Sequence, residues 1–467
     1  MRPLLILAIA ASAAAADPPR WAQDFVERRA ALGKELAPRH VELGKKCDMR
    51  RLHAVARAEY FRALELDPEG AGAHLALGHT KVEGSWFDNP EAGARGNDLT
   101  DRGLAEALGR HRAARRVLAM EAVPKLERLA EWADAHLLEA EALATWREIL
   151  LYDDMNAGAR AATGWVERDG TWISAESAAV RAAARARVEA AKSGWKVGDT
   201  TPLEEQAGWV LTKYRTDAFD FQGFLPESEM REVVKSAEAA RALFLERFEV
   251  PASRRPVTIR GVFVRNQKEH VKFLELQAGL TSLERDLFRA APSWSDPAES
   301  IFEVCVNPWP LEYPKERAVH QTVHFCLQSF AGLDQLPAWL HEGMALWYSD
   351  VLTDRAFVLC CGGKDRDEFL QETPRWRRRI FGQVRDGLAP SLRAVLKTDL
   401  DAMTPREALV AWSFTDWMLD GRRQELFAFL AGMREGASQG KAMREAFGVK
   451  GYDELEGMWR RWVMERY

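Results

Sequence analysis

The sequence predicts an α+β fold, in which an all-helical N-terminal region precedes a domain with a small sheet and a helical C-terminal tail. Three observations predict it. Apolar residues recur at helical spacing through most of residues 17–195. Shorter stretches within residues 205–310 have the alternation typical of strands. Helical spacing then returns from residue 316 to the end, and strands followed by a run of helices are typical of the α+β class.

Length and charge narrow the possible functions. The chain has 467 residues, which is long for one domain, and 47% of them are hydrophobic, enough for a sizeable core. Its net charge of -5 provides no positive field for DNA or RNA, so we expect no nucleic-acid partner.

Residues 1–16 are expected to form a signal peptide. Arg2 precedes an apolar stretch over Leu4–Ala11, and the small residues Ala14–Ala16 suit a cleavage site. No later run reaches the ~20 apolar residues of a membrane helix. We therefore expect a secreted or periplasmic protein with no transmembrane segment in the mature chain.

The predicted helical region, residues 17–195, contains an internal duplication. Residues 60–86 align without a gap to residues 146–172, and the aligned pairs include Trp86 with Trp172. In the second copy, Asp169-Gly170 predicts a tight hairpin. Long amphipathic helices are expected between the copies, interrupted at Pro124.

Each copy resembles part of a tetratricopeptide repeat, although the offset of 86 residues exceeds that family's ~34. This TPR-like region is expected either to bind a protein partner or to serve as a structural arm.

Glycine and proline then mark a domain boundary. The Ala-rich helix over 175–191 leads to Gly194, Gly198 and Pro202, so the second domain is expected at 196–467. Its predicted strands lie over 209–214, 256–264 and 300–306, with a long helix over 227–248. We expect residues 301–306 to form the edge of a cleft, along which an extended peptide pairs.

Five cysteines are present and none forms a CxxC pair, which disfavours a cysteine zinc site. Their odd number leaves at least one thiol unpaired within the monomer. Buried free thiols are the preferred interpretation, and the vicinal Cys360 and Cys361 are not expected to bridge each other.

Two helices over 316–349 carry the candidate site. His320 and His324 are four residues apart, so both imidazoles lie on one helix face. Pro337 suits the first turn of a second helix, which would carry Glu342 inward. Two histidines and a glutamate fit one zinc ion with an open fourth position, as in catalytic zinc sites.

The stretch from Trp339 to Ala345, together with the His-x3-His pair, resembles bacterial gluzincin zinc metallopeptidases of the peptidase-MA-like group. Their pattern is HExxH followed by W-L-x-E-G-x-A. The similarity covers residues 209–467, including the helical tail over 375–467. It implies a zincin fold, a peptide or protein in the cleft, and His320, His324 and Glu342 as the metal ligands.

Two positions depart from that pattern. The family's general-base glutamate is replaced by Gln321, and an amide cannot accept a proton from zinc-bound water. A carboxylate that the family usually has four residues after the glutamate ligand is replaced by Leu346. Together the two changes predict a pseudopeptidase that acts as a binding module.

Two other functions stay open. The first is an active zinc peptidase with a displaced base, for which Glu316 and Glu303 are the candidates, while His341 is expected to face away. The second is a protein-interaction scaffold that uses the TPR-like region as its working surface.

Overall fold

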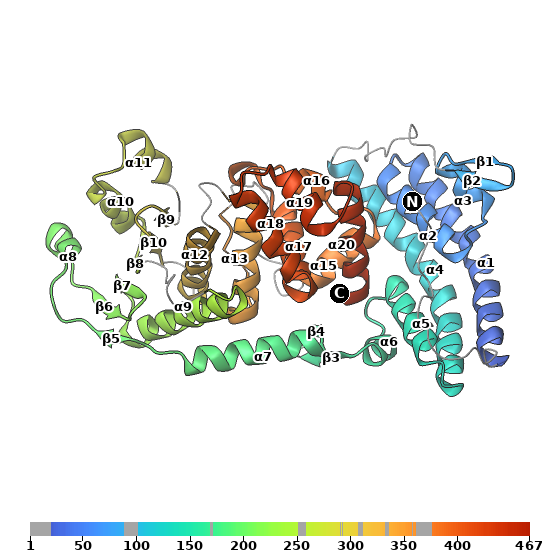
Figure 1. Ribbon diagram of the computed structural model, residues 1–467, viewed down its shortest axis with the longest axis horizontal. Coiled ribbons are helices and arrows are strands. Elements are labelled where there is room, and N and C mark those ends of the chain that lie inside the picture. Colours follow the sequence, from blue (N-terminus) through green and yellow to red (C-terminus); the bar gives the residue numbers. More distant parts are fainter. Residues whose placement is uncertain are drawn as a thin grey trace. The chain divides into compact units, whose positions relative to one another are not determined.

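The computed structural model describes residues 20–87, 101–168, 171–250, 258–289, 291, 293–306, 312–331, 336–356, 358–360 and 376–467. The chain divides into two compact units (Figure 1). Unit 1 comprises Met1–Val166 and Arg385–Leu388, and unit 2 comprises Glu167–Val384 and Ala389–Tyr467. The predicted signal peptide lies outside the described residues.

Unit 1 is mostly helical and its helices enclose their own apolar core. Helix α1 packs on α2 and α4, and α4 packs on α5, around side chains such as Leu36, Leu118 and Ile149. The unit is not all-helical as predicted, since short strands follow α3 and α6. Its elements are α1 (Arg20–Met49), α2 (His53–Leu66), α3 (Ala71–Ala76), β1 (Thr80–Val82), β2 (Ser85–Phe87), α4 (Asp101–Ala135), α5 (Glu139–Tyr152), α6 (Ala157–Ala162) and β3 (Trp165–Arg168).

The duplicated segments have the same element order at the same offset. Helices α2 and α3 with the β1–β2 pair correspond to α5 and α6 with β3 and β4 (Thr171–Ser174). Gly78 and Gly164 occupy equivalent turns, and both have a φ of 78°. Because side chains rarely adopt this conformation, glycine is suited to both turns. The predicted Asp169-Gly170 turn itself lies outside the described residues.

Helix α4 runs through Pro124 without a break, which corrects the predicted interruption. Proline lacks an N–H, so the carbonyl of Met120 loses its helical partner. Met120 is 75% exposed, so water can hydrate that carbonyl and the helix continues.

The boundary between the units lies at Val166, upstream of the predicted position at residue 195. Helix α7 (Ala175–Ala190) belongs to unit 2 because it packs on α9 and α13. Arg181 of α7 binds both carboxylate oxygens of Asp350 at 2.7 Å. Ion pairing across these helices is invisible to local sequence patterns.

Unit 2 contains a mixed sheet in the order β5-β6-β7-β8-β10-β9. The pairs β7–β8 and β8–β10 are parallel and the other pairs are antiparallel. The strands are β5 (Trp195–Lys196), β6 (Thr212–Arg215), β7 (Phe219–Gly223), β8 (Ile259–Val264), β9 (Ser293–Asp296) and β10 (Ile301–Cys305). This sheet and the surrounding helices confirm the predicted mixed α+β class.

Strand β10 is not the edge strand that the sequence predicted. It lies between β8 and β9, with Phe302 opposite both Gly261 and Ser295. In the described part of the sheet, β9 forms that edge instead. Its four residues had no recognisable pattern in the sequence, which explains the error.

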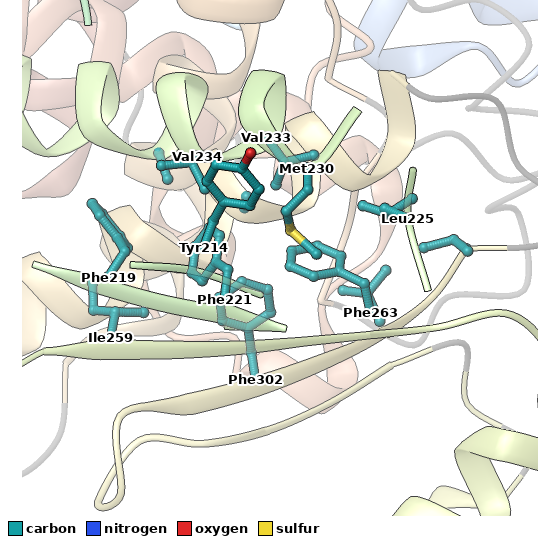
Figure 2. Close-up of a cluster of buried hydrophobic side chains, with 14 of the residues drawn as sticks. Tyr214, Phe219, Phe221, Leu225, Met230, Val233, Val234, Ile259, Phe263 and Phe302 are labelled. Atoms are coloured by element: carbon teal, nitrogen blue, oxygen red, sulfur yellow. The ribbon is translucent and has the colours of Figure 1, made fainter. Parts of the chain in front are cut away.

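An apolar layer joins the sheet to helix α9 (Glu227–Arg247). Figure 2 shows Met230, Val233 and Val234 of α9 facing the rings of Phe221 and Phe263 on the strands. Phe221 also meets Phe302 edge-on, with ring centroids 5.6 Å apart. This packing fixes the sheet against α9, which in turn packs on α12.

Helices build the rest of unit 2. Helix α12 (Glu312–Ala331) packs on α9 and α13 (Ala338–Thr353), and α13 packs on α17 (Pro405–Gly421). The remaining helical elements are α8 (Pro202–Ala207), α10 (Gln267–Leu276), α11 (Ser282–Phe288), α15 (Trp376–Arg385), α16 (Leu392–Val395), η3 (Leu400–Ala402), α18 (Arg423–Arg434), α19 (Gln439–Phe447) and α20 (Tyr452–Arg466). Among the described helices, none combines the length and apolar character needed to cross a bilayer.

Candidate metal centre

Helix α12 supplies two imidazoles to the candidate site. His320 and His324 are 0% and 4% exposed, and their rings lie edge to face with centroids 4.5 Å apart. The one-turn spacing that the sequence indicated therefore brings both Nε2 atoms to one side of the helix.

Helix α13 brings the carboxylate of Glu342 to the same point. Its Oε2 atom lies 3.7 Å from His320 Nε2 and 3.9 Å from His324 Nε2. Glu342 is fully buried, and this oxygen has no hydrogen-bond partner among the described residues. An unsatisfied buried carboxylate oxygen is costly, so its position favours a bound cation.

Cys360 completes the cluster, although the lack of CxxC pairs disfavoured a cysteine zinc site. Its Sγ atom lies 3.3 Å from His320 Nε2 and 3.5 Å from His324 Nε2. One ligand atom from each of His320, His324, Glu342 and Cys360 lies within 4.8 Å of the others. The structure thus brings the three predicted ligand residues together with a fourth candidate side chain.

The four distances from the imidazoles to the sulfur and the carboxylate oxygen are close to those around a tetrahedral metal ion. Zinc bonds of 2.0–2.3 Å at tetrahedral angles place the ligand atoms roughly 3.4–3.6 Å apart. The observed nitrogen–sulfur and nitrogen–oxygen distances span 3.3–3.9 Å. The donors also fit by type, since imidazole, thiolate and carboxylate are all zinc ligands.

A cysteine–histidine–glutamate relay would need a different arrangement. In a catalytic triad, the carboxylate bonds one ring nitrogen and the nucleophile bonds the other. Here both Cys360 and Glu342 face Nε2 of His320. The Nδ1 atoms of His320 and His324 have no hydrogen-bond partner among the described residues. The geometry therefore converges on a point, as a metal site requires.

Those two Nδ1 atoms also lack the support that metal-binding imidazoles usually have. A ligand histidine ordinarily donates its second ring N–H to a carboxylate or carbonyl. Leu346, where the resemblance implies a carboxylate, is fully buried and apolar. The missing carboxylate at this position agrees with the lack of partners at the imidazoles.

Gln321, at the predicted general-base position, lies beside the cluster. It is 2% exposed, and its Nε2 atom lies 4.0 Å from Cys360 Sγ. At this position the amide can donate toward sulfur, but it cannot accept a proton from water. The site therefore has an amide and a thiol where hydrolysis would need a base and a water.

Electrostatics link the anionic ligands to His320. Burial by itself would lower the pKa of His320, but the Cys360 thiolate and the Glu342 carboxylate raise it to about 9. The pKa of Glu342, which burial would raise, is lowered by His320 and by the Cys360 backbone N–H. The Glu342 carboxylate thus favours a positive charge beside it, either a proton or a metal ion.

His341 does not face away from the site as expected. Its ring stacks on that of His324 with centroids 3.7 Å apart and planes 8° from parallel. Burial lowers the pKa of His341 to about 4. The pKa of His324 is also lowered, by burial and by its neighbours His341, His320 and Arg317. Both rings are therefore neutral near pH 7, which is the form that binds metal.

Glu316 and Glu303, the two candidates for a displaced general base, make hydrogen bonds to other groups. Glu316 accepts a hydrogen bond from the Val358 backbone N–H at 2.7 Å. Glu303 lies 2.7 Å from Nδ1 of His270, whose Nε2 lies 3.0 Å from the Phe288 carbonyl. Both carboxylates thus have structural contacts in this conformation.

Arg317 is a site residue that the sequence reasoning missed. Its Nη1 atom lies 3.7 Å from Cys360 Sγ, and its side chain is buried. Burial would lower its pKa, but the Cys360 thiolate and other anionic neighbours raise it. Helical spacing could have indicated Arg317, because it lies one turn before His320 and positions i and i+3 share a helix face. No such spacing indicates Cys360, since it lies beyond α13.

A scan of the chain against known protein families, curated proteins and solved structures found no match. The gluzincin resemblance therefore stays a prediction that depends on the residues of α12 and α13.

Proposed function

We propose that this chain is a zinc-binding pseudopeptidase, secreted or periplasmic, which acts as a binding module for a peptide or protein. One zinc ion would be held by His320, His324, Glu342 and Cys360. The observation that carries the proposal is the position of the Cys360 thiol, 3.3 and 3.5 Å from the two imidazoles.

The thiol explains why hydrolysis is not expected. Zinc with three protein ligands activates a water at its fourth position, whereas zinc with four protein ligands is structural. Cys360 would fill the fourth position, and Gln321 has no lone pair basic enough to accept the water's proton. Loss of the general base alone costs about 10²–10⁴-fold in rate. The chain thus lacks both parts of the hydrolytic step.

The four ligands also join separate elements. His320 and His324 come from α12, Glu342 from α13, and Cys360 from the segment beyond α13. A shared ion would stabilise their mutual arrangement, because metal-binding free energy adds to folding free energy when the site exists only in the folded state.

Metal content and peptide hydrolysis test the proposal together. The purified chain is expected to contain one zinc per molecule, and Glu342→Ala to contain markedly less. Neither protein should hydrolyse a mixed peptide library above background. A matched control is Glu284→Ala, because Glu284 caps α11 through Thr281 and takes no part in the cluster. Hydrolysis by the native protein that His320→Ala abolishes would refute the loss of catalysis.

A further inference from the structure

Cys360 differs from the other three ligand residues in its exposure. His320 and Glu342 are fully buried and His324 is 4% exposed, whereas Cys360 is partly exposed. Cys360 is therefore the most exposed of the four residues in the cluster.

Two buried carboxylates hold the segment that carries this thiol. Glu342 accepts a hydrogen bond from the Cys360 backbone N–H at 2.9 Å, and Glu316 accepts one from Val358 at 2.7 Å. We call residues 358–360 the thiol latch. Glu342 thus has two contacts at the site, with Oε1 on the latch and Oε2 facing the imidazoles.

Arg317 contacts the sulfur. Its buried guanidinium lies 3.7 Å from Sγ and can donate to it. A neighbouring guanidinium stabilises a thiolate, which is both the nucleophile and the metal ligand. The same charge repels a metal cation, so the thiolate's negative charge is needed to offset it.

From these contacts we propose that Cys360 is a modification site for disulfide compounds, and that its modification releases the metal. The inference rests on the proposed zinc site. The Cys360 thiolate attacks one sulfur of a low-molecular-weight disulfide, and that S–S bond breaks as the Cys360 S–S bond forms. The other half leaves as a thiolate and takes a proton from solvent.

Loss of the thiolate removes one negative charge and one ligand. The mixed-disulfide sulfur is neutral, and the Arg317 guanidinium then faces the cation with only Glu342 to offset it. Zinc affinity should fall by more than the ~10–100-fold that loss of an outer-shell partner causes.

The other described cysteines should not compete. Cys47, Cys305 and Cys326 are buried, and burial raises the pKa of Cys47 and of Cys326 to about 12. Both are therefore protonated and poorly nucleophilic near neutral pH.

The test treats the zinc-loaded chain with glutathione disulfide and follows the protein mass and the free zinc, using a chromogenic chelator. A Cys361→Ser background removes the neighbouring thiol. We expect one glutathione per chain, one zinc released at the same rate, and zinc binding regained after a phosphine reductant. The comparison is Cys360→Asp, which has no thiol at this position, so glutathione disulfide should not release the zinc that this variant holds.

The outcomes separate the two proposals. If zinc stays bound while Cys360 carries glutathione, the latch inference is wrong and the zinc site stands. Zinc release by Cys360→Asp under the same treatment would also overturn the inference. A native chain that binds no zinc at all would overturn the proposed function, and the inference with it.

Discussion

Cys360 and Gln321 meet at the cluster formed by His320, His324 and Glu342, with 4.0 Å between the sulfur and the amide nitrogen. In the proposed site, each of these two residues would block hydrolysis in a different way. In the proposed zinc site the thiol would supply a fourth protein ligand, and the amide would remove the proton acceptor. Because the two effects are separate, reversing one of them should not restore catalysis.

The double variant Gln321→Glu/Cys360→Ala should therefore gain peptide hydrolysis, about 100-fold or more above either single variant. The alanine opens the fourth ligand position and the glutamate can accept the water's proton. The rate is measured on a mixed fluorogenic peptide library, with a chelator to confirm metal dependence. Equal activity in Gln321→Glu alone would contradict the assignment of Cys360 to the fourth position.

At this scale the sequence predicted three side chains of the cluster and missed the fourth, Cys360. His320 and His324 follow from helical spacing, and Glu342 follows from the motif on the next helix. Cys360 lies beyond α13, and its position depends on the hydrogen bonds to Glu316 and Glu342. Such side chain to backbone contacts have no sequence period, so pattern analysis could not find them.

At the scale of the elements, helix α13, which carries Glu342, packs closely on α17 at Gly343. A Cβ at this residue would lie 2.5 Å from the Ala411 carbonyl oxygen and 2.6 Å from Thr415 Oγ1. The glycine next to the Glu342 ligand is thus required by helix packing. The backbone carbonyl cannot rotate away as a long side chain could.

Gly343→Ala should lower the free energy of unfolding by about 1–3 kcal/mol, since it overpacks a tight helix contact. Urea denaturation measures the loss, and zinc content reports any shift of Glu342. The matched control is Gly382→Ala in α15, where a Cβ would meet no heavy atom within 4 Å. This control should be neutral, or more stable by up to about 1 kcal/mol. An unchanged free energy of unfolding in Gly343→Ala would show that α13 and α17 are less closely packed.

Elements with strong periodicity were predictable, whereas their partners were not. Helix α9 was expected over 227–248 and is observed at Glu227–Arg247. The place of β10 in the sheet could not be predicted, because it depends on pairing with β9, a strand of four residues. Local pattern identifies an element, but strand order depends on long-range contacts.

At the scale of the whole molecule, unit 1 contains a buried polar network. Glu59, 1% exposed, lies 2.6 Å from His40 Nδ1 and 2.8 Å from His111 Nε2. Arg115 donates to the same carboxylate at 3.1 Å. Although burial would raise the pKa of Glu59, Arg115 and the two histidines hold it well below the usual range. Burial lowers the pKa of His40.

Unit 1 should therefore lose stability in acid. Below about pH 6.5 the unfolded chain binds a proton at His40, whereas burial opposes protonation of this residue in the folded chain. The free energy of unfolding therefore decreases as pH falls. The lowered pKa of Glu59 acts in the same direction below about pH 4.5. Calorimetry between about pH 7 and pH 5 should show a steeper loss of stability for the native chain than for His40→Gln. Equal slopes would exclude His40 as the source.

Zinc K-edge X-ray absorption of the purified chain tests the four-ligand centre most directly. The account predicts one sulfur scatterer at about 2.3 Å together with three nitrogen or oxygen scatterers at about 2.0–2.2 Å. The sulfur signal should vanish in Cys360→Asp and persist in Cys361→Ser. A native spectrum with only nitrogen and oxygen neighbours would contradict it, because the fourth position would then be open to water.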